Sequence, residues 1–280
     1  MSRIEARFKT LSAANRAALI PYIMTGDPSP DETVAVMHGL VAGGADMIEL
    51  GMPFSDPVAD GSIIQAAGER ALAAGQRLKH SLAAVRAFRE TDQDTPVIFM
   101  GYLNPVEIMG TEAFVQSAAE AGVDGLLLVD SPPEESAELA PAVREAGMDM
   151  IFLVAPTTSE VRRRRIAELG SGFVYYVSLK GVTGAGGLDV DAVAESLAGL
   201  RQHTQLPLGV GFGIRDADSA AAVGRVADAV IVGSALVEHL HAAAGQGEEP
   251  ARAARQFIEP LREALDGARS GGNAKDVALS

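Results

Sequence analysis

The sequence contains no cysteine, and its few histidines lack the spacing of metal ligands. The absence of cysteine excludes disulfide bonds, thiolate catalysis and zinc fingers, and it is compatible with a reducing compartment. His239 and His241 are two residues apart on a predicted helix, so their side chains point to different sides of it. We therefore expect no metal site in this chain.

Positive charge and long apolar runs are also scarce. The 23 lysines and arginines face 37 aspartates and glutamates, which gives a formal net charge of −14. Such a chain repels nucleic acid and anionic membranes, so an anionic substrate must be held by local groups. No apolar run reaches the roughly 18 residues that span a bilayer, and the charged N-terminus lacks the apolar core of a signal peptide. The sequence predicts a soluble, cytoplasmic protein.

Short apolar strands alternate with helical patterns along the 280 residues. The predicted strands are 18–24, 46–50, 97–101, 125–129, 150–154, 173–178, 208–211 and 229–232. The predicted helices are about 4–14, 31–43, 62–74, 81–89, 111–121, 132–147, 159–169, 190–201, 216–224, 235–243 and 251–265. This alternation indicates an α/β protein with a parallel sheet, and the chain is long enough for a barrel.

An aspartate recurs where a predicted helix ends and a strand begins, at Asp46, Asp124, Asp149 and Asp228. The spacings of 78, 25 and 79 residues approximate three, one and three copies of one unit. A βα unit used eight times predicts a single (βα)8 TIM barrel over residues 1–268, with an N-terminal helix and extra short helices. An open doubly wound sheet is the alternative. We expect residues 269–280 to form a disordered tail.

The most informative stretch is ELGMPFSDPVADG, residues 49–61. Side chains alternate along a strand, so Glu49 faces away from Ile48 and Leu50 and toward the barrel interior. Ionising a carboxyl group there costs several kcal/mol unless other groups compensate. Asp60 follows on the loop, and barrel chemistry occurs at this end of the strands. Two carboxyl groups in different environments suit acid–base catalysis, although a lone strand glutamate is more often structural.

Three glycine-bearing loops follow the late predicted strands, at 180–187, 211–214 and 233–234. Backbone N–H groups exposed by glycine, together with a helix N-terminus, can bind phosphate without a positive side chain. Any one of these loops could simply be a turn, but barrel enzymes commonly bind phosphate after their late strands. None of the loops matches a P-loop or a dinucleotide-binding fingerprint, which argues against nucleotide binding.

Two further side chains near the sixth predicted strand have open roles. Tyr175 is either a core residue or a site residue, because strand register alone does not decide its direction. Lys180 could form a Schiff base if it were desolvated, but its place in a glycine-rich loop favours a solvated lysine.

Taken together, the segments ELGMPFSDPVADG, GYLNP, GVTG and GFGI resemble the tryptophan synthase α subunit family, and the resemblance extends from Pro21 to about Leu240. It implies a TIM barrel that cleaves indole-3-glycerol phosphate to indole and glyceraldehyde 3-phosphate in L-tryptophan biosynthesis. By this resemblance Glu49, Asp60 and Tyr175 are the catalytic residues. The positions implied for binding substrate or phosphate are Tyr22, Met100, Leu127, Thr183, Gly184, Phe212, Gly213, Ile231, Gly233 and Ser234. Tyr22 stands where phenylalanine is more usual, and Phe173 stands where a tyrosine can occur.

The resemblance also implies a partner, the tryptophan synthase β subunit, in an α2β2 heterotetramer. No cofactor is expected in this chain, and pyridoxal phosphate is expected in the β subunit. The residues implied for the partner surface are Pro53, Asp56, Pro57, Asn104 and Pro132. Thr183 is expected to position Asp60 when its loop closes over the site.

Two other functions remain open at this point. One is a different phosphate-binding barrel, such as a Schiff-base aldolase that uses Lys180. The other is a non-catalytic subunit that keeps the barrel mainly to activate a partner, although the Glu49 and Asp60 pair argues against it.

Overall fold

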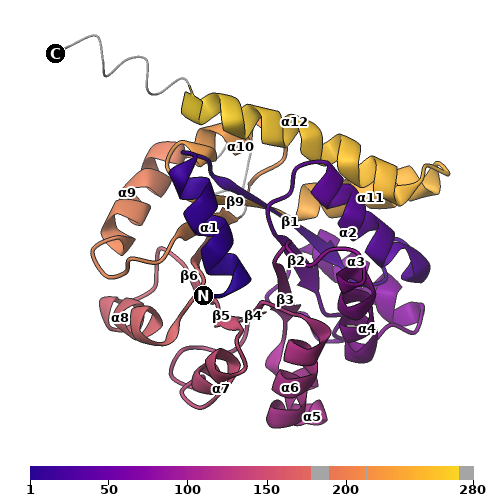
Figure 1. The fold of residues 1–280 in the computed structure, drawn as a ribbon, viewed down its shortest axis with the longest axis horizontal. Coiled ribbons are helices and arrows are strands. Elements are labelled where there is room, and N and C mark those ends of the chain that lie inside the picture. The colour runs from indigo at the N-terminus through magenta and orange to yellow at the C-terminus, as the bar shows by residue number, and fades with distance from the viewer. Residues whose placement is uncertain (178–188, 212, 271–280) are drawn as a thin grey trace.

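The protein is a closed parallel β-barrel surrounded by helices (Figure 1), seen in a computed structural model that describes residues 1–177, 189–211 and 213–270. The strands are β1 (Ala18–Met24), β2 (Ile48–Gly51), β3 (Val97–Gly101), β4 (Gly125–Leu128), β5 (Asp149–Met150), β6 (Phe152–Val154), β7 (Val174–Val177), β8 (Leu208–Gly211) and β9 (Ala229–Val232). Their order in the sheet is β5-β4-β3-β2-β1-β9-β8-β7-β6. Because β5 and β6 stand at opposite ends of this order yet are separated by Ile151 alone, the sheet closes on itself.

The helices lie outside the barrel, except for α1. They are α1 (Arg3–Ala13), the 3-10 turn η1 (Pro30–Glu32), α2 (Thr33–Ala42), α3 (Ser62–Ala73), α4 (Leu78–Arg89), α5 (Leu103–Met109), α6 (Thr111–Ala121), α7 (Leu139–Glu145), α8 (Glu160–Leu169), α9 (Val190–Leu200), α10 (Ala217–Gly224), α11 (Ser234–Gly245) and α12 (Pro250–Ser270). None of the helices in the described ranges is long and apolar enough to cross a membrane.

The predicted barrel is confirmed, and the open doubly wound alternative is wrong, because the strand order closes. Several boundaries differ from the prediction. The predicted strand 150–154 is two short strands, the helix expected to begin at Pro132 begins at Leu139, and α5 was not predicted. Helix α12 continues to Ser270, so the expected tail cannot begin at Arg269, whose guanidinium donates to the carbonyl oxygens of Gly224 and Ala227. Residues 271–280 lie outside the described part of the chain.

Alternation along the strands divides the core into two layers. Side chains that face the helices form the larger cluster, which includes Leu19, Ile48 and Phe99. Side chains that face the barrel axis form a second cluster, which includes Ile98 and Leu127. Glu49 follows Ile48 on β2 and therefore belongs to the inward-facing set, as the sequence predicts.

Helix α1 closes the end of the barrel where the strands begin, and Figure 1 shows it lying across that end. Its buried side chains, Ile4, Phe8 and Leu11, belong to the same cluster as the inward-facing strand residues. The ring of Phe8 lies 5.8 Å from that of Phe173 on the approach to β7. The opposite end, where the strands finish, is left for the functional loops.

The recurring aspartates tie neighbouring strands together at the end that α1 closes. Asp46 accepts a hydrogen bond from the backbone N–H of Leu19 at 2.9 Å, and Asp228 accepts one from Leu208 at 2.8 Å. Each also pairs with an arginine, Arg262 for Asp46 and Arg201 for Asp228. Each aspartate thus fixes the start of the preceding strand in the barrel while an arginine balances its charge.

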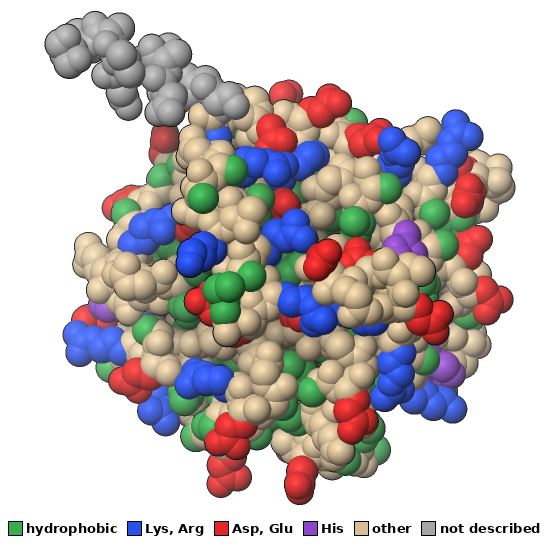
Figure 2. Space-filling model, in the orientation of Figure 1, with side chains coloured by type: hydrophobic (Ala, Val, Ile, Leu, Met, Phe, Trp, Pro, Cys, Tyr) green, Lys and Arg blue, Asp and Glu red, His purple; other side chains and the backbone are tan. Residues whose placement is uncertain are grey.

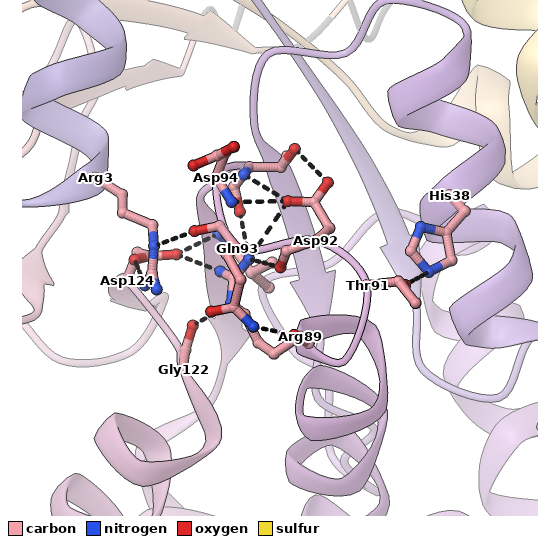
Figure 3. Close-up of polar contacts among 11 residues, drawn as sticks. Arg3, His38, Arg89, Thr91, Asp92, Gln93, Asp94, Gly122 and Asp124 are labelled. Atoms are coloured by element: carbon pink, nitrogen blue, oxygen red, sulfur yellow. Dashed lines mark hydrogen bonds and ion pairs between the residues drawn. The ribbon is translucent and has the colours of Figure 1, made fainter.

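Asp124 makes the same connection (Figure 3) and, like Asp46, is buried. One carboxylate oxygen accepts from the N–H of Val97 at 2.8 Å and from Arg89 at 2.7 Å, and the other accepts from Arg3 of α1 at 2.8 Å. The Arg89 guanidinium also donates to the carbonyl oxygens of Gly122 and Thr95. Asp124 therefore joins two strands, one outer helix and the closing helix.

The surface at this end carries both signs of charge. In Figure 2, which has the orientation of Figure 1, blue basic and red acidic side chains are interspersed rather than gathered into one field. The net charge of −14 is thus not concentrated on this face as an acidic patch.

Candidate active site

Glu49 lies inside the barrel on the buried strand β2. It is level with Tyr22 on β1 and Ile98 on β3, and 1% of its surface is exposed. Its Oε1 atom has no hydrogen-bond partner among the described residues. Burial, with a smaller contribution from the nearby Asp60 carboxylate, raises the pKa of Glu49 to about 8. The carboxyl group is thus largely protonated near neutral pH and can donate a proton.

Asp60 reaches the same cavity from the loop between β2 and α3. The loop backbone is held by Gln65, whose amide donates to the carbonyl oxygens of Pro57 at 3.1 Å and of Asp60 at 2.9 Å. Burial raises the pKa of Asp60 to about 6, and a hydrogen bond with the Tyr102 hydroxyl opposes the rise. Near neutral pH this carboxyl group is therefore mainly ionised, in contrast to Glu49.

The two acids line a cavity of about 390 Å³ at the carboxyl ends of the strands. Its walls are mostly apolar, which explains why both acids are harder to ionise than in water. The other residues that line it are Tyr22, Ala59, Gly61, Ile63, Ile64, Met100, Val129, Leu153, Tyr175, Val177, Gly213, Ile214, Arg215, Ile231, Gly233, Ser234, Ala235 and Glu238. A volume of this size accommodates a small organic molecule.

Glycines after β8 and β9 shape another part of the cavity wall. Gly213 has a φ of +80°, a conformation that side chains other than glycine rarely adopt. Gly233 precedes the first turn of α11, where Ser234 and Ala235 also line the cavity. The first N–H groups of a helix have no acceptor within the helix, so this turn can donate to an anion. The late-strand glycines thus lie where a phosphate group could bind.

Tyr175 packs inward on β7, which answers the question that register left open. Burial, with a smaller effect from Glu49, raises its pKa well above the ordinary value, so it stays protonated. Its ring lies against Gly211, where a Cβ atom would come within 2.0 Å of the tyrosine oxygen. The absence of a side chain at position 211 therefore makes room for the inward tyrosine.

The remaining predicted binding residues are only partly brought together. Tyr22, Met100, Gly213, Ile231, Gly233 and Ser234 line the cavity. Leu127 does not: it is fully buried among the inner barrel side chains, and Val129 lines the cavity instead. Thr183, Gly184 and Phe212 lie outside the described residues, as does Lys180.

Sequence reasoning missed several lining residues. Val129 and Leu153 each follow an inward-facing residue, Leu127 and Ile151, by two positions, so the strand period could have identified them. Tyr102, which contacts the Asp60 loop from the segment between β3 and α5, does not line the cavity, and no sequence pattern pointed to it.

The predicted partner residues are not equally accessible. Asp56 and Asn104 are exposed, and Pro57 and Pro132 are half-buried. Pro53 is buried within this chain, so it forms no part of the exposed surface, contrary to the prediction. Within residues 1–177, 189–211 and 213–270, no three acidic or histidine side chains are grouped so that they could hold a metal ion.

Comparison with known proteins decides which barrel this is. The family model for the tryptophan synthase alpha chain matches residues 8–266. The chain belongs to the tryptophan synthase α chain family. The family's chain from Thioalkalivibrio sulfidiphilus is 61% identical over 266 residues, which cover 95% of this chain and 100% of the relative. The chain from Marinobacter nauticus is 56% identical, with coverage of 95% and 98%.

Solved structures of the tryptophan synthase α chain family share the fold. The α subunit from Legionella pneumophila superposes with a TM-score of 0.90 at 43% identity, covering 95% of this chain and 99% of that one. Tryptophan synthase from M. tuberculosis gives a TM-score of 0.84 at 37% identity, covering 95% and 99%. As a member of the family, the chain is a carbon–carbon lyase of the α reaction in tryptophan biosynthesis.

Proposed function

We propose that Glu49 and Asp60 divide the chemistry of the α reaction, the retro-aldol cleavage of indole-3-glycerol phosphate to indole and glyceraldehyde 3-phosphate. The observation that carries this assignment is the pair of carboxyl groups in one cavity, with pKa values of about 8 for Glu49 and about 6 for Asp60. Environments that separate two acids in this way allow one to donate a proton while the other stays charged.

The reaction begins with protonation of indole C3 by Glu49. The positive charge that then develops at the ring nitrogen is stabilised by the Asp60 carboxylate, which accepts a hydrogen bond from the indole N–H. The Glu49 carboxylate next takes the proton of the side-chain hydroxyl adjacent to C3. As the carbon–carbon bond breaks, its electron pair restores the aromatic ring and an aldehyde forms. Glu49 ends protonated, as it began, so the cycle needs no cofactor.

Other cavity residues bind the substrate in this assignment. Apolar side chains, including Met100 and Ile231, pack against the indole ring. Gly213, Gly233 and the first turn of α11 bind the phosphate, which needs local donors because the chain is strongly acidic. Tyr175 borders Glu49 and limits its contact with water. Thr183, Gly184 and Phe212 are proposed to complete the site.

The dependence of indole release on pH tests this assignment. Activity requires ionised Asp60 and protonated Glu49, so kcat/KM should rise through about pH 6 and fall through about pH 8. Indole can be measured as it forms from indole-3-glycerol phosphate. A rate that keeps rising above pH 9 would contradict a proton donation by Glu49, and the absence of indole at every pH from folded protein would contradict the function.

We also propose a partner, the tryptophan synthase β subunit, which would receive the indole, carry the pyridoxal phosphate and form an α2β2 assembly. Two apolar side chains support a docking surface near the Asp60 loop and α5. Val58 is 86% exposed and Ile108 is 79% exposed, which is unusual for large hydrophobic residues. Asp56 and Asn104 lie on the same two segments.

Replacing Ile108 by lysine should weaken the response to the β subunit. We expect the concentration of β subunit that gives half-maximal stimulation of indole release to rise about tenfold, because a charge would enter an apolar contact. Val161→Lys is the matched control, since Val161 is also 79% exposed but lies on α8, outside the proposed surface. If both variants weaken the response equally, or if neither weakens it, docking at α5 is contradicted.

A further inference from the structure

Tyr102 joins the Asp60 loop to the neighbouring strand and helix. It stands between β3 and α5, and 4% of its surface is exposed. Its hydroxyl oxygen accepts a hydrogen bond from the backbone N–H of Ala59 at 3.0 Å. Asp60 is the next residue of the loop, and hydrogen bonding by the Tyr102 hydroxyl lowers the pKa of its carboxyl group against the effect of burial. One side chain therefore contacts both the backbone of the loop and its acidic group.

The tyrosine itself is held firmly. Its ring lies 5.2 Å from that of Phe54, which belongs to the same loop. The next residue, Leu103, donates its backbone N–H to Asp130 at 2.8 Å, which fixes the start of α5. The hydroxyl thus projects toward the Asp60 loop from a fixed base, and it can act as a rigid support.

No other side chain among those described matches this contact. Gln65 also holds the loop, but it donates to the carbonyl oxygens of Pro57 and Asp60 rather than to the carboxylate. The hydroxyl of Tyr22 points at the sulfur of Met24, 4.0 Å away. Gln65 therefore supports the loop backbone alone, and its contribution can be separated from that of Tyr102 by mutation.

We propose that Tyr102 is a positioning residue of the α reaction, whose hydroxyl holds the Asp60 carboxylate toward the cavity and fixes the loop at Ala59. The proposal rests on the role assigned to Asp60 above. A hydroxyl that donates a hydrogen bond to a carboxylate favours its charged form, and the charged form of Asp60 must accept a hydrogen bond from the indole N–H. In this way, a residue that contacts no substrate atom sets the fraction of the enzyme in which Asp60 is ionised at a given pH.

The other ionisable groups around Asp60 do not supply this effect. Glu49 and Glu238 are acids, which disfavour a second negative charge nearby. The pKa values of Tyr22 and Tyr175 are raised well above the ordinary value by burial, so both stay protonated through the neutral range. Arg215, the one cation among the lining residues that the structure describes, is exposed at the glycine-bearing part of the wall.

Tyr102→Phe tests the proposal, because it removes the hydroxyl and keeps the ring against Phe54. We expect the acid limb of the kcat/KM profile to move up by roughly one pH unit, the effect of losing one hydrogen bond to a charged group. The loss of activity should accordingly be near tenfold on the acid side and smaller at alkaline pH. A merely structural role would lower activity equally at all pH values.

Three further variants complete the experiment, each assayed for indole release with the β subunit in excess. Tyr176→Phe removes a hydroxyl from a buried tyrosine outside the cavity and should leave the profile unchanged. Gln65→Met removes only the backbone contacts and should leave the acid limb in place. Asp60→Asn should abolish the acid limb with most of the activity. If Asp60→Asn retains activity, the proposed function fails; if it does not, and Tyr102→Phe leaves the acid limb unmoved, the inference alone fails.

Discussion

Glu49→Gln is expected to lower the rate of indole formation by about 10²–10⁴-fold or more, the range for loss of a general acid, while substrate affinity changes by less than about tenfold. The amide has nearly the shape of the protonated carboxyl group, so the cavity should keep its form. It cannot give a proton to C3 or take one from the hydroxyl. The loss should therefore appear in kcat, and it should be similar with and without the β subunit.

Single-turnover measurements with indole-3-glycerol phosphate would separate binding from the chemical step. Glu238→Gln is the matched control, because Glu238 lines the same cavity but is exposed and has no role in the proposed chemistry. It should retain most of the activity. Substantial turnover by Glu49→Gln would remove Glu49 from the mechanism and leave Asp60 as the sole acid in question.

Asp124→Ala is expected to cost about 3–5 kcal/mol of stability, the usual effect of removing one partner from a buried ion pair. The substitution leaves the guanidinium of Arg89, whose side chain is 8% exposed, beside an empty position. It also removes the acceptor for the Val97 N–H and the contact with Arg3. A fall in the melting temperature of roughly 10 °C is expected for a chain of this size.

Asp228→Ala provides the comparison at an equivalent junction. Asp228 and Arg201 are 30% and 47% exposed in their side chains, so water screens the pair. Its loss should cost about 1 kcal/mol, close to the value for exposed pairs. Thermal unfolding of the two variants distinguishes the cases. Equal losses would show that the strand N–H contacts, which both aspartates make, matter more than the buried charge.

Much of the fold follows from patterns along the chain, because each βα unit carries its own signals. The alternation of strands with helices, the glycines after helices and the repeated aspartates all predict the barrel. The patterns fail where tertiary contacts decide. The helix expected from Pro132 is delayed to Leu139 because the Ser136 hydroxyl bonds the Pro132 carbonyl oxygen and pairs with Ser131, which stabilises turns instead.

The candidate site shows the same division. Glu49 and Asp60 could be found from the sequence, since one strand and its following loop carry both. Leu127 was expected only from the family resemblance. It and Val129 lie on the inward face of the same segment, and strand alternation does not give their depth along the barrel. Tyr102 is 42 residues from Asp60 in the chain, and only the pairing of β2 with β3 brings their segments together.

The position of α1 affects the path by which substrate and products reach and leave the cavity. Phe8 and its neighbours fill the end of the barrel where the strands begin, and they pack against inward-facing residues such as Phe173. In the part of the chain that the structure describes, α1 closes one end of the barrel, and the cavity lies at the other end among the loops that follow the strands. If substrate and products pass through the open end, a protein docked beside the Asp60 loop and α5 would stand where indole leaves the cavity.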